Sequence, residues 1–278
     1  MAANQPTKKS EIIYQYGKPL EDVLPLRALF YAEGLFETFR WKNVPPALLK
    51  DHVTRMKRGA ELLCIPFPGA EKIRKAAETA VKLSGIEDAY VKICLLSSGS
   101  LKFYDRASRS RLLIVVRKYE PTKERMTAHV TSFRRFSQSR LLSIKSLNYL
   151  ENMLARREAK SAGCDEAIFL NEKGEVAEGS FTNIFWVKGR TLYTPSLECG
   201  LLPGITRGAL LSLAPGLELK VVQGKFHLKE VLSSQGAFLT NSLIGISTIT
   251  AVDKTKLPCD EKLFMKLKDA LFKKMKWV

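Results

Sequence analysis

Three groups of residues, widely spaced along the chain, have the chemistry to hold and activate a carbonyl cofactor. Lys145, in Ile-Lys-Ser-Leu-Asn-Tyr, is an amine that can capture an aldehyde once burial or neighbouring cations lower its pKa. Glu178, in Ala-Glu-Gly-Ser-Phe-Thr-Asn, supplies a carboxylate. Leu202-Pro-Gly-Ile-Thr-Arg207 is a glycine turn that opens a helix, whose first amides suit a dianionic phosphate. In this order the three groups predict a pyridoxal phosphate site.

The residues around Lys145 predict a half-buried setting. Leu141, Leu142, Ile144 and Leu147 flank it, and an amphipathic helix is expected from 147 to 161. Taken alone, a lysine in front of a helix is usually a surface residue. The two later sequence groups are what favour a catalytic amine.

The spacing of apolar residues predicts a mixed α and β chain with two lobes. Strands are expected at 11–17, 35–41, 89–96, 111–116, 127–132, 166–170, 183–187, 191–194, 218–222, 237–240 and 246–250, and helices at 48–63, 70–83, 147–161, 205–213, near 228 and at 260–276. The polar segment 119–125 contains a proline and is the expected linker between a small N-terminal α+β domain, 1–118, and a large cofactor-binding domain, 126–278.

Composition excludes several classes of protein. The 278 residues are 45% hydrophobic and 26% charged, which is ordinary for a globular chain. No apolar run is long enough for a membrane span, and the N-terminal residues lack the apolar stretch of a signal peptide, so a cytoplasmic protein is expected. The five cysteines have no CxxC spacing and the three histidines lie far apart, so neither a disulfide framework nor a metal site is expected.

The formal net charge of +17 is a hint of an anionic partner. The positive residues are spread along the chain in short runs such as Arg134-Arg135, without the interleaved aromatics of single-strand binders. A small anionic substrate is therefore expected, and nucleic acid is not. A non-catalytic nucleic-acid binding module is kept only as a remote alternative.

From about Tyr31 to Thr250, these sequence groups resemble the fold-type IV, or class IV aminotransferase, family of pyridoxal phosphate enzymes. The family contains aminodeoxychorismate lyases, branched-chain aminotransferases and D-amino acid aminotransferases. The resemblance implies an α+β fold, with a small N-terminal α/β sandwich and a larger C-terminal barrel-like domain. It also implies a homodimer that binds the cofactor between the domains.

The resemblance also implies roles for individual residues. Lys145 would form the Schiff base with the cofactor and then move a proton. Glu178 would keep the pyridine nitrogen protonated, and Tyr149, expected one helical turn after Lys145, would bind the ring hydroxyl. Arg55, in His-Val-Thr-Arg-Met, matches the phosphate-binding arginine, with Arg58 as the fallback. The expected cofactor-binding residues are Arg55, Lys145, Tyr149, Glu178, Gly204, Ile205, Thr206, Asn241 and Ser242.

The reaction is less clearly indicated than the cofactor. Thr38 matches a threonine near the reacting centre of the lyases, Lys92 and Lys102 match basic substrate-binding positions, and Asn241 resembles the lyase sequence. The turn Ser97–Phe103 lacks the arginine and histidine of the D-amino acid enzymes. The leading expectation is a lyase that releases pyruvate and 4-aminobenzoate from 4-amino-4-deoxychorismate, in folate biosynthesis. The alternative is a branched-chain or D-amino acid aminotransferase of amino acid metabolism.

Overall fold

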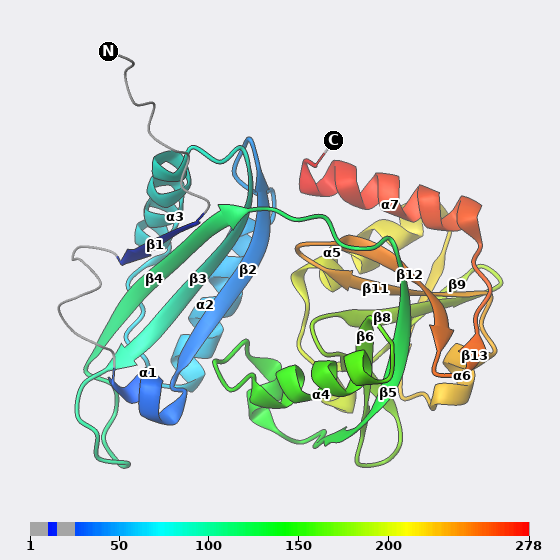
Figure 1. Ribbon diagram of the computed structural model, residues 1–278, viewed down its shortest axis with the longest axis horizontal. Helices are drawn as coiled ribbons and strands as arrows, with labels where there is room; N and C mark the ends of the chain where they lie inside the picture. Colours follow the sequence, from blue (N-terminus) through cyan, green and yellow to red (C-terminus); the bar gives the residue numbers. More distant parts are fainter. Residues whose placement is uncertain (1–10, 16–25, 278) are drawn as a thin grey trace. The chain divides into compact units, whose positions relative to one another are not determined.

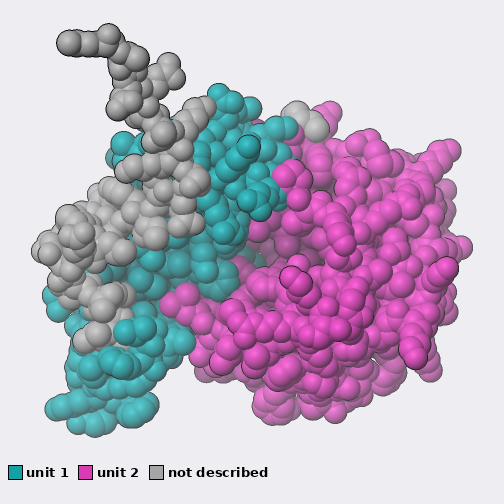
Figure 2. All heavy atoms as spheres, in the orientation of Figure 1, with its two compact units in different colours: residues 1–120 teal, residues 121–278 magenta. Residues whose placement is uncertain are grey.

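The computed structural model describes residues 11–15 and 26–277 (Figure 1). The chain divides into two compact units, residues 1–120 and 121–278 (Figure 2). The division falls between Glu120 and Pro121. The assignment of independent domains and of a linker at 119–125 stays a prediction.

Unit 1 is a four-stranded antiparallel sheet with helices packed on it (Figure 1). The strand order is β1-β4-β3-β2. Its elements are β1 (Glu11–Gln15), α1 (Leu26–Tyr31), β2 (Gly34–Lys42), α2 (Leu49–Leu62), α3 (Ala70–Ser84), β3 (Asp88–Ser98) and β4 (Arg109–Lys118). Buried Val53, Met56 and Ala60 recur at helical spacing along α2, so one face of this helix enters the core.

Unit 2 contains a nine-stranded mixed sheet that curls into a half-barrel. The strand order is β10-β9-β8-β11-β12-β5-β6-β7, with β13 paired to β12. The strands are β5 (Arg125–Arg135), β6 (Glu166–Asn171), β7 (Val176–Gly179), β8 (Asn183–Lys188), β9 (Thr191–Pro195), β10 (Lys220–Gly224), β11 (Gly236–Asn241), β12 (Gly245–Val252) and β13 (Thr255–Lys256). The α-helices are α4 (Leu150–Ser161), α5 (Ile205–Leu213), α6 (Leu228–Leu232) and α7 (Glu261–Met275), and short 3-10 helices span Arg140–Ser143, Leu197–Cys199 and Ala214–Leu217.

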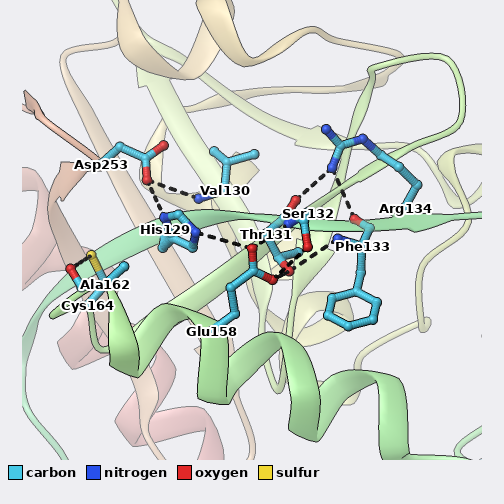
Figure 3. Close-up of polar contacts among 10 residues, drawn as sticks. All are labelled: His129, Val130, Thr131, Ser132, Phe133, Arg134, Glu158, Ala162, Cys164 and Asp253. Carbon is cyan, nitrogen blue, oxygen red and sulfur yellow. Dashed lines mark hydrogen bonds and ion pairs between the residues drawn. The ribbon is translucent and has the colours of Figure 1, made fainter.

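Helix α4 is fixed to strand β5 by a polar cluster near its C-terminal end (Figure 3). Glu158 accepts hydrogen bonds from Thr131 Oγ1 at 2.5 Å and from the Ser132 amide at 2.8 Å. His129 lies beside Glu158 and bonds Asp253 Oδ1 through Nδ1 at 2.6 Å. The cluster joins β5, α4 and the turn after β12. These bonds fix the position of α4 against the sheet.

The predicted fold class is confirmed, and three local predictions are wrong. Helix α4 begins at Leu150 rather than 147, because the Tyr149 amide bonds the Leu147 carbonyl in a tight turn at 2.7 Å. Tyr149 therefore does not follow Lys145 by a helical turn. Glu178 lies within a short strand, β7, that the apolar pattern did not indicate. Strand β10 begins at Lys220, because Glu218 adopts a left-handed conformation (φ +61°) that ends the preceding 3-10 helix.

Within 11–15 and 26–277, no helix is long and apolar enough to cross a membrane. The same residues contain no group of three or more His, Cys, Asp or Glu side chains that could hold a metal ion. Residues 16 and 17, expected to continue the first strand, lie outside the described part of the chain.

Candidate active site

Lys145 lies in the non-helical segment between the 3-10 helix Arg140–Ser143 and α4. Its Nζ is 5.1 Å from the centre of the Tyr149 ring. The Tyr149 hydroxyl donates to the Ser180 carbonyl oxygen at 3.2 Å, and Asn152 Nδ2 donates to the same oxygen at 2.6 Å. Residues on both sides of the α4 N-terminus thus hold the loop that directly follows β7.

Glu178 lies on β7, and its buried carboxylate contacts Arg135 and the Leu202 amide. Its Oε2 accepts a hydrogen bond from the Leu202 amide at 3.0 Å, and its Oε1 is 3.3 Å from Arg135 Nη2. Burial raises the pKa of Glu178, whereas Arg135, the Leu202 amide and the nearby charge of Lys145 act to lower it. Lys145 and Glu178 are therefore close enough to influence each other electrostatically.

Arg135, at the end of β5, is the main residue that sequence reasoning missed. Its guanidinium carbon lies 3.8 Å from the centre of the Phe169 ring, and it pairs with both Glu178 and Glu151. Arg135 Nε is buried and has no hydrogen-bond partner within the described residues. The sequence signal for it is the pair Arg134-Arg135, which by itself indicates no more than a short basic run.

The start of α5 and the end of β11 meet at two hydroxyl groups. Thr206 Oγ1 and Ser242 Oγ are 2.9 Å apart, and both residues are buried. Gly204 is the N-terminal cap of α5, so the first amides of this nine-residue helix follow directly. Sequence reasoning chose both arms of this site, and the structure brings them together.

The donors at this point fit a phosphate group. Two hydroxyls and the first amides of a helix are groups that bind a dianion. Thr240, two residues before Ser242, is buried, and its Oγ1 has no hydrogen-bond partner in the part of the chain that the structure describes. A Cβ at Gly204 would lie 1.9 Å from Asn183 Oδ1, so any larger residue here would displace the Asn183 side chain.

Asn241 braces the turn that follows β11. Its Oδ1 accepts hydrogen bonds from the Leu243 and Ile244 amides at 2.9 Å each, and its Nδ2 donates to the Phe181 carbonyl at 3.2 Å. The side chain therefore shapes the turn around Ser242 and ties it to the loop after β7. A direct contact of Asn241 with a cofactor stays a prediction.

Arg55 lies in unit 1, where it belongs to a buried ion cluster. Its Nε and Nη2 donate to the two carboxylate oxygens of Glu37 at 2.8 and 2.6 Å, and His52 Nδ1 is 2.6 Å from Glu37 Oε2. Burial acts to raise the pKa of Glu37, but the charges and hydrogen bonds of Arg55 and His52 outweigh it and lower the pKa to about 2. Arg58, the fallback, is exposed.

The expected substrate residues of unit 1 are only partly brought together. Thr38 on β2 is the direct cross-strand partner of Lys92 on β3, and Lys92 Nζ lies 4.5 Å from the centre of the Phe36 ring. Lys102 is exposed in the loop between β3 and β4. Lys102 comes after Ser98, the last residue of β3. With a rise of about 3.3 Å per residue, the strand between Lys92 and Ser98 is about 20 Å long.

The family model for class IV amino-transferases matches residues 34–252. The chain belongs to the class IV aminotransferase family. The expected family is therefore confirmed, and the chain is an enzyme. The remote alternative of a non-catalytic nucleic-acid binding module has no support.

Similar members of the class IV family include both lyases and aminotransferases. Aminodeoxychorismate lyase of Bacillus subtilis (strain 168) is 32% identical over 87% of each chain. The branched-chain-amino-acid aminotransferase of Pseudomonas aeruginosa is 30% identical over 84% of this chain and 83% of its own. The crystal structure of the branched-chain aminotransferase of Thermoproteus uzoniensis has a TM-score of 0.86 at 28% identity, covering 95% of this chain and 96% of that chain.

Proposed function

We propose that this chain is a pyridoxal phosphate enzyme whose cofactor is held in unit 2 by Lys145. The observation that carries the proposal is that Lys145 lies beside Tyr149 and near the charge of Glu178, and that Glu178 accepts a bond from the Leu202 amide at the turn leading to Thr206. When bound, the cofactor supplies a protonated ring that withdraws electrons from the reacting carbon. The assignment of Arg55 to the cofactor phosphate stays a prediction from the sequence.

Each residue of the site has a separate role in the proposed reaction. Lys145 removes the proton from the substrate carbon that carries the amino group, and its Nζ holds that proton before passing it on. Glu178 would pair with the ring nitrogen and favour its protonation, and Arg135 opposes the effect of burial on the pKa of this carboxyl group. Thr206 and Ser242 hold the phosphate, which fixes the ring relative to Lys145.

The proposed reaction is the release of pyruvate and 4-aminobenzoate from 4-amino-4-deoxychorismate, which would place the enzyme in folate biosynthesis. Two features support it. The first is the similarity to the Bacillus subtilis lyase. The second is the pairing of Thr38 with Lys92 across β2 and β3, which sets a hydroxyl beside a cation suited to an anionic substrate.

An aminotransferase acting on a branched-chain amino acid is the second candidate, supported by the Pseudomonas aeruginosa relative and by Tyr149. The same lysine and glutamate serve both reactions, because the two differ in where the proton goes after it leaves the substrate. D-amino acid specificity has less support, because Ser97–Phe103 lacks the expected arginine and histidine.

The lyase proposal is tested by incubating the purified protein with 4-amino-4-deoxychorismate and measuring 4-aminobenzoate and pyruvate. Both should form in equal amounts. Lys145→Ala should lose at least 10²–10⁴-fold in turnover, because the proton carrier is gone. Lys160→Ala, which changes an exposed lysine of α4, is the matched control. Transamination of leucine without 4-aminobenzoate formation would establish the second candidate instead.

We also propose that the chain forms a homodimer through the N-terminal half of α4. Leu150, Met153 and Leu154 are 64%, 43% and 36% exposed and recur at helical spacing, so they form one apolar face. Exposed apolar faces of this kind commonly mark contacts between subunits.

A further inference from the structure

The turn Leu202–Gly204 carries both ends of the proposed cofactor site. The amide of Leu202 donates to Glu178 Oε2 at 3.0 Å, so the start of the turn holds the carboxylate. Gly204 caps α5, so the end of the turn positions the helix amides and Thr206. The distance between the Glu178 carboxylate and the phosphate-binding groups therefore depends on the backbone conformation of Leu202–Gly204.

Asn183, the first residue of β8, bonds the start of this turn and lies against its end with one side chain. Its Nδ2 donates to the Leu202 carbonyl at 3.0 Å. Its Oδ1 lies against Gly204, where a Cβ would come within 1.9 Å of it. The residue is only 6% exposed, so water does not readily replace these contacts.

The side chain of Asn183 is not needed to place its own strand. The backbone of Asn183 pairs with Thr240 in the ladder between β8 and β11, and that ladder continues over the next four residue pairs. The strand therefore stays in register without the amide group. The side-chain amide of Asn183 instead restricts the conformation of the turn Leu202–Gly204.

We propose that Asn183 is a positioning residue that sets the spacing between the ring-nitrogen carboxylate and the phosphate-binding start of α5. The inference rests on the proposed function, because it assumes that one ligand occupies both ends. Such a ligand binds well only when both ends are correctly spaced. Loss of the amide should therefore weaken the benefit that the phosphate group gives to binding.

The test compares pyridoxal phosphate with pyridoxal, which lacks the phosphate, by absorbance titration of the full chain freed of cofactor. In the wild type the phosphate should strengthen binding strongly. In Asn183→Ala this benefit should fall by about tenfold, because the α5 amides and Glu178 are no longer held at one spacing. A double variant with Glu178→Gln should lose less than the product of the two single effects, because both changes disturb the same turn.

Asn171→Ala is the matched control, because Asn171 is also a buried asparagine and braces the turn between β6 and β7 through the Lys173 and Glu175 amides. It should lower stability without changing the ratio of the two affinities. An unchanged ratio in Asn183→Ala, or an equal change in Asn171→Ala, would overturn the inference alone. Failure of the wild type to bind pyridoxal phosphate would overturn the proposed function as well.

Discussion

At the scale of single residues, the pair of Glu178 and Arg135 decides whether the carboxylate can do its proposed work. A buried carboxylate tends to keep its proton, and the pKa of Glu178 is raised for that reason. Arg135 is the largest of the charges that oppose burial. Arg135 is itself buried against Phe169, and its guanidinium is shared between Glu178 and Glu151.

Arg135→Met should shift the acid limb of the pH profile of kcat/KM to higher pH. With the opposing charge removed, the pKa of Glu178 rises further, so a higher pH is needed to ionise it. Activity at the acid end should fall by about tenfold and recover as the pH rises. Arg134→Met is the control, because Arg134 bonds backbone carbonyls of Thr131 and Phe133 instead. A profile that falls equally at every pH would contradict this role.

Sequence reasoning found the residues whose local sequence is distinctive and missed those defined by distant contacts. Lys145, Glu178 and Thr206 stand in recognisable sequence groups. Arg135 and Asn183 act through segments far along the chain, namely β7 and the turn Leu202–Gly204. Asn183 ends the sequence group of Glu178, but nothing in that group indicates its contact with the turn 19 residues later.

At the scale of elements, long periodic segments were predictable and short or tightly turned ones were not. Helices α2, α3 and α7 lie within one or two residues of their predicted bounds, because each buries one continuous face. Strand β7 has four residues, all buried, so it shows no alternation that could reveal it. The start of α4 was misplaced because a backbone turn, rather than apolar spacing, determines it.

The ion cluster between β2 and α2 gives unit 1 a pH-dependent stability. The pKa of Glu37 is lowered to about 2, so its contribution is fully present above its ordinary pKa and is lost as the pH falls from about 4.5 to about 2. Between pH 5 and pH 2, the free energy of unfolding should fall by about 3 kcal/mol more in the wild type than in Glu37→Gln. Urea unfolding at a series of pH values measures this difference.

Asp88→Asn provides the control for that experiment. Asp88 also forms a two-point pair, with Arg40, but it is 39% exposed. A partly exposed pair of this kind contributes at most about 1 kcal/mol. Equal pH dependence in the two variants would show that the burial of Glu37 has no special effect.

At the scale of the whole molecule, the proposed dimer contact through the exposed face of α4 can be tested by measuring the oligomeric state. Leu150→Asp combined with Met153→Asp should halve the mass in solution measured by light scattering, because two charges would have to be buried at the contact. Met265→Asp is the control, since Met265 is 45% exposed on α7, at the opposite edge of unit 2 in Figure 1. A wild type that is monomeric at micromolar concentration would contradict the proposed dimer.

The central claim is that the amine of Lys145 binds the aldehyde of pyridoxal phosphate. Borohydride reduction of the cofactor-saturated protein makes such a bond permanent, and peptide mapping then locates it. The cofactor should be found on the peptide that contains Lys145, at about one molecule per chain. An unlabelled Lys145, or a label on another lysine, would contradict the account for the lyase and the aminotransferase alike.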